Sequence, residues 1–170
     1  MPVLQIVVYG DPILTRKAEP VKKINEKIVK LAQNRVKTMH SAPGIGLSAP
    51  QVKTSKRLIT VDLSVGEKSE ALIILVNPEL VSQEGMVTSE EGCLSVPGIQ
   101  EKVARSAKVV VKGIDLEGKE KVIEAEDLLA RVLCHEIDHL NGKLFIDHLS
   151  PLKRSLIKKK LKKQFETKNP

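Results

Sequence analysis

Apolar side chains recur every three to four residues in two stretches of the chain, which is the spacing of one face of an α-helix. The first stretch covers about 25–40 and stops before the Pro-Gly pair at 43–44, which ends a helix. The second covers about 126–140 and stops at the Asn-Gly pair at 141–142. We therefore predict one helix in each stretch. The apolar positions are Ile28, Val29, Ala32, Val36 and Met39 in the first helix, and Leu128, Leu129, Val132, Leu133, Ile137 and Leu140 in the second.

Between these helices the pattern changes to short segments that are rich in β-branched residues and separated by turn residues. A Glu-Gly pair at 117–118 marks one of the turns. The segments are 57–63, 71–76, 86–96, 107–116 and 121–125. We interpret them as antiparallel strands. The expected fold class is α+β, with these strands packed around the second helix as a central helix, and with further helices near the N-terminus and the C-terminus.

The length of 170 residues suits a single domain, and no repeat or low-complexity linker divides the chain. No apolar run approaches the roughly 20 residues that a membrane-spanning helix needs, so no membrane contact is expected. The N-terminus has the pattern of neither a signal peptide nor a transit peptide, which predicts a cytoplasmic protein. In that reducing compartment Cys93 and Cys134 are expected to be buried, metal-bound or catalytic rather than joined in a disulfide.

The net charge of +7 comes from the C-terminal end of the chain. Residues 1–150 carry 20 basic and 20 acidic residues, whereas residues 151–170 carry 8 and 1. Ser150-Pro151 suits the start of a helix, because serine caps it and proline fits its first position. The apolar positions that follow are Leu152, Leu156, Leu161 and Phe165. We predict an amphipathic C-terminal helix with a basic outer face, which belongs to the same domain.

The basic helix raises the question of nucleic-acid binding. With no Trp, one Tyr and two Phe, the chain is poor in the aromatic side chains on which single-stranded bases stack. Contact with nucleic acid would therefore be made to phosphates, and sequence-specific recognition is not expected. The simpler alternative is that the lysines form a solvated helix face.

The second predicted helix contains the strongest chemical signal, the sequence His135-Glu136-Ile137-Asp138-His139. Two histidines four positions apart on a helix point the same way and can bind one metal ion. Leu128 and Val132 lie on the same stripe, which predicts that this face points inward. The alternative is a pair of hydrogen-bonded core histidines. Glu136 is turned about 100° from His135, so it can act as a general base beside a water at the metal.

A catalytic metal site needs about three protein ligands, so a third ligand must be found. Gly142 follows the motif, but residue 145 is Phe where one large protease class has a third histidine. The basic tail offers only Glu166, which disfavours the class with a later glutamate. Upstream, Cys93 lies in the Glu-Gly-Cys-Leu-Ser segment 91–95, and a thiolate with two imidazoles is a good metal site. Taken by itself, Cys93 would more often be a small buried apolar residue than a ligand.

The segment 44–51, Gly-Ile-Gly-Leu-Ser-Ala-Pro-Gln, is too rich in glycine and proline to continue the first helix. It lacks the patterns of known phosphate-binding loops, and a simple loop is one interpretation. Its glycines also suit close approach of the backbone to a ligand, with the Gln51 side-chain amide as a hydrogen-bond donor.

The segments GIGLSAPQ, EGCLS and HEIDH, in this order and at these separations, closely resemble the three signature motifs of the peptide deformylases. The likeness extends from GDPILTRKAEPV at 10–21 to GKLFIDHLSPLK at 142–153. The resemblance implies a catalytic domain over 1–150 in which Cys93, His135 and His139 hold one divalent metal ion. It implies Fe(II) in cells, with Zn, Ni or Co as substitutes.

The resemblance also implies a reaction, the hydrolysis of the N-formyl group from the initiator methionine of nascent polypeptides, with release of formate. Glu136 would transfer the proton, while Gln51 and the Leu94 amide would stabilise the negative oxygen. The substrate-binding residues would be Gly44, Ile45, Gly46, Leu94 and Val132. Arg131 is expected near this pocket as a solvated rim residue.

Two positions depart from the family pattern, because Ser48 stands where alanine is common and Cys134 where glutamine is common. Neither change removes a ligand or the base, but both affect the expected hydrogen bonds around the site. A ribosome would offer RNA phosphates to the basic helix. The rival functions are a metallopeptidase and a non-enzymatic RNA-associated protein, and the presence of Glu136 and Gln51 argues against the second.

Overall fold

The computed structural model describes the backbone of residues 3–168 and the side chains of residues 3–164. Its largest element is a five-stranded antiparallel sheet with the strand order β1-β2-β3-β6-β7. A second, two-stranded antiparallel sheet is formed by β4 and β5. The strands are β1 (Gly46–Ser48), β2 (Leu58–Val61), β3 (Ile73–Glu84), β4 (Val87–Cys93), β5 (Val96–Arg105), β6 (Lys108–Ile114) and β7 (Glu120–Glu126).

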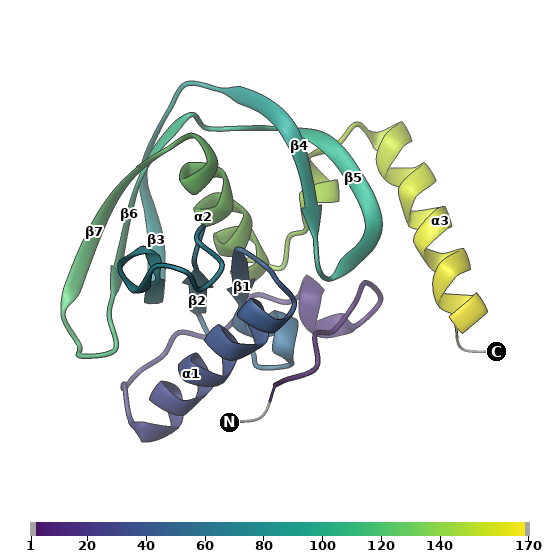
Figure 1. Ribbon diagram of the computed structural model, residues 1–170. Coiled ribbons are helices and arrows are strands. Elements are labelled where there is room, and N and C mark those ends of the chain that lie inside the picture. The colour runs from purple at the N-terminus through teal and green to yellow at the C-terminus, as the bar shows by residue number, and fades with distance from the viewer. Residues whose placement is uncertain (1–2, 169–170) are drawn as a thin grey trace.

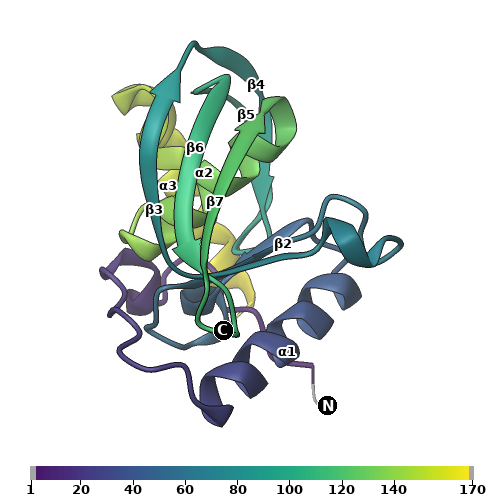
Figure 2. The same cartoon turned by 90° about the vertical axis from the view of Figure 1, so that its left-hand side faces the viewer.

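The helix α2 (Asp127–Leu140) lies at the centre of the molecule, between strands β3, β6 and β7 on one side and the β4–β5 ribbon on the other (Figure 1). The helix α1 (Glu26–Ser41) packs near β1 and β2, and α3 (Pro151–Lys168) lies beside β5. After a turn of 90°, α2 is seen behind β3, β6 and β7 (Figure 2). This arrangement confirms the predicted α+β class with antiparallel strands around a central helix. Short 3-10 turns are η1 (Pro12–Thr15), η2 (Ala49–Val52), η3 (Ser69–Ala71) and η4 (Phe145–His148).

The central helix is buried on nearly every side because a sheet covers each of its two flanks. Leu133 and Leu140 pack into the main core with Ile59, Leu75 and Val111 of the large sheet. The opposite flank of α2 carries polar side chains that bond to the β4–β5 ribbon. Helix α2 therefore joins an apolar core on one side to a polar, chemically active layer on the other.

The predicted helices agree with α1 and α2 to within a residue or two at each end. One apolar position is wrong, because Leu128 is 51% exposed at the start of α2, where the strands no longer cover the helix. The strand β5 was not predicted as a separate element, since Pro97 and Gly98 interrupt its pattern. Within residues 3–168, no helix combines the length and apolar character needed to cross a bilayer.

The C-terminal helix starts where the sequence predicts, with the Ser150 side chain accepting a bond from the Lys153 amide at 3.3 Å. Its predicted apolar stripe is confirmed at Leu161 but wrong at two other positions. Leu152 and Leu156 are 71% and 57% exposed, while Ile157 and Leu161 are buried. The helix docks along a narrow line at the edge of the molecule, against a cluster that includes residues of β5 and η4. This contact buries only a few apolar side chains of the helix. The predicted position Phe165 lies outside the described side chains.

Arg35 is fully buried on the inner face of α1. The spacing of apolar residues does not predict that a charged side chain is buried there. Its three guanidinium nitrogens have no hydrogen-bond partner among the described residues. Burial lowers the pKa of this guanidinium to about 10. The charge is therefore held in the core at a cost of about 3 kcal/mol at neutral pH.

Replacement of Arg35 by methionine, which has a similar length and no charge, is expected to raise the free energy of unfolding by about 1–4 kcal/mol. The folded-state pKa lies below the unfolded value, so the penalty is fully present below about pH 10 and is tested at pH 7. Urea denaturation measures the change, with Lys30→Met on the same helix as the control, because Lys30 is exposed. Equal or lower stability of Arg35→Met would contradict the expectation.

Candidate metal centre and active site

Three side chains with metal-binding atoms meet at the inner end of the β4–β5 ribbon. Cys93 ends β4, and His135 and His139 lie one turn apart on α2. The distance from Cys93 Sγ to His139 Nε2 is 3.4 Å, and that between the two Nε2 atoms is 3.1 Å. All the ligand atoms lie within 4.8 Å of one another. The structure thus brings together the three ligands that the sequence pattern predicts.

The chemistry of this donor set fits a divalent cation. Bonds of about 2.0–2.3 Å to one tetrahedral ion place its ligand atoms roughly 3.3–3.6 Å apart, close to the separations found. Burial lowers the pKa of His139 well below its usual range, which keeps the imidazole neutral. Burial also acts to lower the pKa of His135, but Cys93, Glu136 and Glu91 raise it well above its usual value. This negative surrounding is one that a bound cation would neutralise.

The orientation of His135 is fixed by a carboxylate behind it. Glu91 Oε2 is 2.7 Å from His135 Nδ1, which leaves Nε2 directed at the cluster. Arg105 donates to both oxygens of Glu91, at 3.1 and 2.7 Å, and Arg131 donates to Oε1 at 3.0 Å. Burial acts to raise the pKa of Glu91, but the hydrogen bonds with His135 and Arg105 hold this pKa well below its usual range. Glu91 is therefore an ionised anchor for the ring.

Arg131 is not the solvated rim residue that the sequence predicts. It is 6% exposed and donates to the main-chain oxygens of Val103 at 2.9 Å and Val87 at 2.7 Å. The prediction is wrong because helical position gives the direction of a side chain but not the strands that cover it. Arg131 instead joins α2 to the β4–β5 ribbon.

The carboxylate of Glu136 lies at the wall of the site. The side chain is 3% exposed, and its Oε1 atom has no hydrogen-bond partner among the described residues. Burial raises the pKa of Glu136 to about 7, which suits a group that takes and returns a proton. A Cβ atom at Gly46 would lie 2.6 Å from Glu136 Oε2 and 2.9 Å from Val132 Cγ1. A glycine at this position is what lets β1 approach the carboxylate.

The side-chain amide of Gln51 is held in one orientation in the 3-10 turn after β1. Its Oε1 accepts from the Ser48 main-chain N–H at 2.9 Å and from the Ser48 hydroxyl at 3.1 Å. Its Nε2 donates to Ser95 Oγ at 3.1 Å and to Cys93 Sγ at 3.5 Å. The unusual Ser48 therefore adds a hydrogen bond to Gln51. The other unusual residue, Cys134, is buried in the main core.

A cavity of about 800 Å³ opens between β1, the β4–β5 ribbon and α2. His139 does not line the cavity and is 1% exposed, so it lies beneath Cys93 and His135. The predicted site residues that line the cavity are Gly44, Ile45, Gly46, Gln51, Cys93, Leu94, Val132, His135 and Glu136. The cavity thus brings Cys93, His135 and the carboxylate of Glu136 into one space with a pocket lined by both polar and apolar residues.

Several residues of the site were missed by the sequence analysis. Arg105 bonds to Glu91, and it also donates to Asp138 at 2.6 Å, which in turn contacts His148 at 2.7 Å. Leu128 lines the mouth of the cavity. No local signal identifies Arg105, because strand register pairs it with Val87, and only the tertiary fold brings its side chain to Glu91.

Two histidines one turn apart on a helix, a cysteine from a strand that converges with them, and a buried carboxylate beside an open cavity are the arrangement typical of a metal-dependent hydrolase. The family model described as polypeptide deformylase matches residues 3–155. A peptide deformylase of Thermodesulfovibrio yellowstonii is 53% identical over 162 residues, 95% of this chain and 98% of the relative. One of Syntrophobacter fumaroxidans is 49% identical over 166 residues, 98% of each.

Solved structures give the same result. The crystal structure of a peptide deformylase from Legionella pneumophila matches with a TM-score of 0.90 and 44% identity, covering 99% of this chain and all of the other. The crystal structure of the Ehrlichia chaffeensis peptide deformylase in complex with actinonin matches with a TM-score of 0.88 and 37% identity. The match covers 96% of this chain and 98% of the other. The chain belongs to the peptide deformylase family. Its activity is the metal-dependent hydrolytic removal of the N-formyl group from the N-terminal methionine of nascent polypeptides.

Proposed function

We propose that Cys93, His135 and His139 hold one divalent metal ion, which is Fe(II) in cells and which Zn, Ni or Co can replace. The observation that carries the proposal is the convergence of one sulfur and two nitrogen atoms within 4.8 Å. A thiolate with two imidazoles suits these borderline ions. When bound, such an ion lowers the pKa of a water molecule and withdraws electrons from the formyl oxygen.

Glu136 is the proposed proton-transfer group. It is buried, it lines the cavity, and its Oε1 atom is unpartnered among the described residues, so it can accept a proton from the attacking water. It then returns the proton to the methionine nitrogen as the bond between the formyl carbon and that nitrogen breaks. The products are formate and a free N-terminal amine.

Gln51 and the main-chain N–H of Leu94 are proposed to stabilise the negative charge that develops on the formyl oxygen. Ser48 and Ser95 hold the Gln51 amide beside Cys93, and the N–H that donates to Cys93 Sγ at 3.5 Å is the one that would turn to the formyl oxygen. Loss of one such donor costs about 2.7–4 kcal/mol of transition-state stabilisation.

The substrate is proposed to lie along the cavity wall. Gly44 and Gly46 let the backbone of this wall lie close against Leu94 and Glu136, so that the substrate backbone can approach it. A Cβ at Gly44 would lie 3.0 Å from Leu94 Cδ1. Ile45, Leu94 and Val132 supply apolar surface for the unbranched methionine side chain.

Incubation of anaerobically prepared protein with formyl-Met-Ala-Ser tests the proposal, with formate and the free amine measured together. One formate per new amine is expected, and acetyl-Met-Ala-Ser should react much more slowly. Release of free methionine or formyl-methionine would instead indicate a metallopeptidase. Absence of both reactions in the metal-loaded protein would contradict any catalytic role.

The partners are proposed to be nascent N-formylmethionyl polypeptides in the cytoplasm, where translation produces them. We also propose that residues 1–150 form the catalytic domain and that 151–170 are part of the same domain. Burial of Ile157 and Leu161 against the cluster that contains Val96 and Ile99 supports this, because Ile99 also lines the active-site cavity. Removal of the helix would uncover that cluster.

The basic face of α3 is proposed to contact RNA phosphates of the ribosome, because such contacts gain affinity by releasing counterions. The double change Lys159→Gln and Lys162→Gln on exposed positions is expected to reduce the slope of log affinity against log salt by about 2. Co-sedimentation with ribosomes at several salt concentrations measures this slope. Turnover of formyl-Met-Ala-Ser should be unchanged. Equal co-sedimentation of variant and parent at every salt concentration would show that the lysines are merely solvated.

If the metal is Fe(II), activity is expected to decay in air, because a thiolate beside a redox-active ion is readily oxidised. Zinc has no redox chemistry and provides the control. The half-lives of the iron and zinc forms are compared in air and under nitrogen, with residual formate release as the readout. The expectation fails if the two forms lose activity equally fast in air.

A further inference from the structure

A second cavity, of about 470 Å³, lies between α3 and the turn at Tyr9–Gly10. It shares no lining residue with the catalytic cavity. Its charged lining residues are all basic, namely Arg154, Lys158, Lys159 and Lys162. No acidic side chain of the described chain lines it. This cavity is called the basic groove below.

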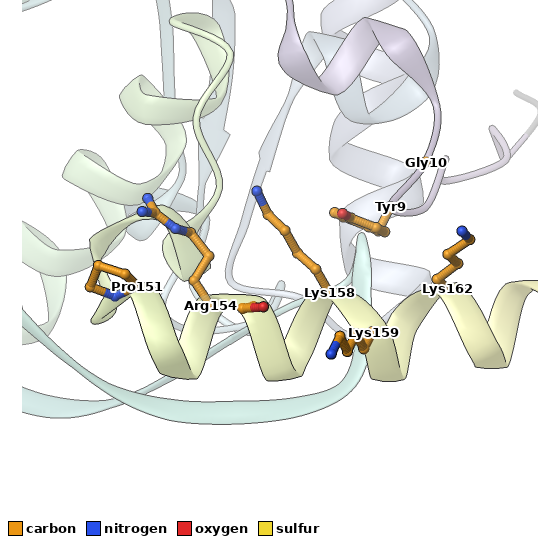
Figure 3. Close-up of a pocket in the computed structure, with 8 residues that line it drawn as sticks. Tyr9, Gly10, Pro151, Arg154, Lys158, Lys159 and Lys162 are labelled. Carbon is orange, nitrogen blue, oxygen red and sulfur yellow. The ribbon is translucent and has the colours of Figure 1, made fainter.

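The rotation of α3 is fixed by its two buried residues, Ile157 and Leu161. Arg154, Lys158 and Lys162 are spaced four positions apart, so they form one row with a rise of about 6 Å per step. These three side chains extend toward the side of α3 on which Tyr9 and Gly10 lie (Figure 3). The helix therefore directs one row of cations into the groove.

This row is unfavourable in the absence of an anion, because like charges four positions apart on a helix repel each other. Lys153, outside the groove, is paired with Glu101 at 3.3 Å. Arg154 gives one N–H to the main-chain oxygen of Asp147 at 3.5 Å, and a guanidinium has five N–H donors. The groove thus presents an excess of donors and positive charge to a ligand with several anionic oxygens.

Tyr9, the single tyrosine of the chain, forms the opposite wall of the groove. It is half-buried and packs on the same cluster as Ile157 and Leu161. Its main-chain N–H donates to the Ser95 oxygen at 2.7 Å, which anchors the turn. An aromatic ring fixed beside a row of cations is the combination with which proteins bind a nucleotide, because bases stack on the ring and phosphates pair with the cations.

We propose that the basic groove binds a nucleotide, with its phosphates on Arg154, Lys158 and Lys162 and its base against Tyr9. The volume of the groove lies in the range of small-molecule sites. With a single aromatic ring, the site does not discriminate between base sequences. The nucleotide is either free, as a nucleoside triphosphate, or part of a single RNA strand, and both present the same chemistry.

The test uses the full-length, metal-loaded protein at low salt. A fluorescent hexauridylate is titrated by anisotropy, and ATP is added as a competitor. Lys158→Gln is compared with Lys160→Gln, which removes the same charge from an exposed position of α3 outside the groove. Lys158→Gln is expected to weaken binding about tenfold, because it removes a charged hydrogen bond. Lys160→Gln should change it by less than about twofold.

Two further variants examine the ring. Tyr9→Leu should weaken binding, whereas Tyr9→Phe, which keeps the ring, should not. Displacement by ATP assigns the site to free nucleotides, and binding of the hexauridylate without displacement by ATP assigns it to an RNA strand. Unchanged melting temperature and formyl-peptide turnover in Lys158→Gln exclude misfolding. Equal losses in Lys158→Gln and Lys160→Gln, or no binding of either ligand, would overturn the proposal.

Discussion

Replacement of Glu136 by alanine is expected to lower kcat/KM for formyl-Met-Ala-Ser by about 10²–10⁴-fold, while the metal content stays at one ion per chain. The reason is that Glu136 is not among the three converging ligands, whereas its carboxylate lines the cavity next to them. Formate release and metal analysis on the same preparation measure the two effects.

Glu136→Gln is the matched variant, because glutamine fills the same space beside Gly46 and cannot take the proton. It should be nearly as inactive as Glu136→Ala, which separates proton transfer from loss of volume. If either variant lost its metal together with its activity, Glu136 would have to be counted among the ligands.

The second large effect is expected from Cys93→Ser, which replaces a thiolate by a poor neutral ligand. Metal affinity should fall by more than about 100-fold, since groups that only orient a ligand already contribute 10–100-fold. The rate of metal loss to a chelator measures the change, and activity at micromolar metal should fall with it.

Cys134→Ser is the matched control for this experiment. Cys134 is also a buried cysteine, and it lies next to His135 in sequence, but it belongs to the main core rather than to the converging ligands. This variant should keep its metal. Unchanged metal retention in Cys93→Ser would show that the third ligand lies elsewhere.

The fold could be predicted from the sequence where burial is one-sided and periodic. α1, α2 and most strands follow from the repeat of apolar positions, because each buries a regular face. The prediction failed at the edges of the molecule. Leu152 and Leu156 fit a helical stripe but are exposed, because what covers a helix depends on partners distant in sequence. For the same reason, a pattern of apolar residues gave no sign of the buried Arg35.

The convergence of Cys93, His135 and His139 beside Glu136 could be predicted because metal chemistry restricts both residue types and their spacing on a helix. The groups that orient them could not. Glu91 is ionised and fixed by Arg105 and Arg131, which lie 14 and 40 positions away in the chain. Such pairs depend on how distant strands and helix α2 pack together, which the local sequence does not contain.

The positions of the proposed ligands also affect how the chain holds together. Cys93 and His139 are separated by 46 positions, and they belong to the β4–β5 ribbon and to α2 respectively. An ion bound to both closes a loop of that length in the folded chain, and because the unfolded chain rarely holds a preformed site, binding of the ion stabilises the fold by mass action. The metal would then act as a reversible cross-link between the β4–β5 ribbon and α2. The lifetime of the folded enzyme would therefore depend on the concentration of available metal in its surroundings.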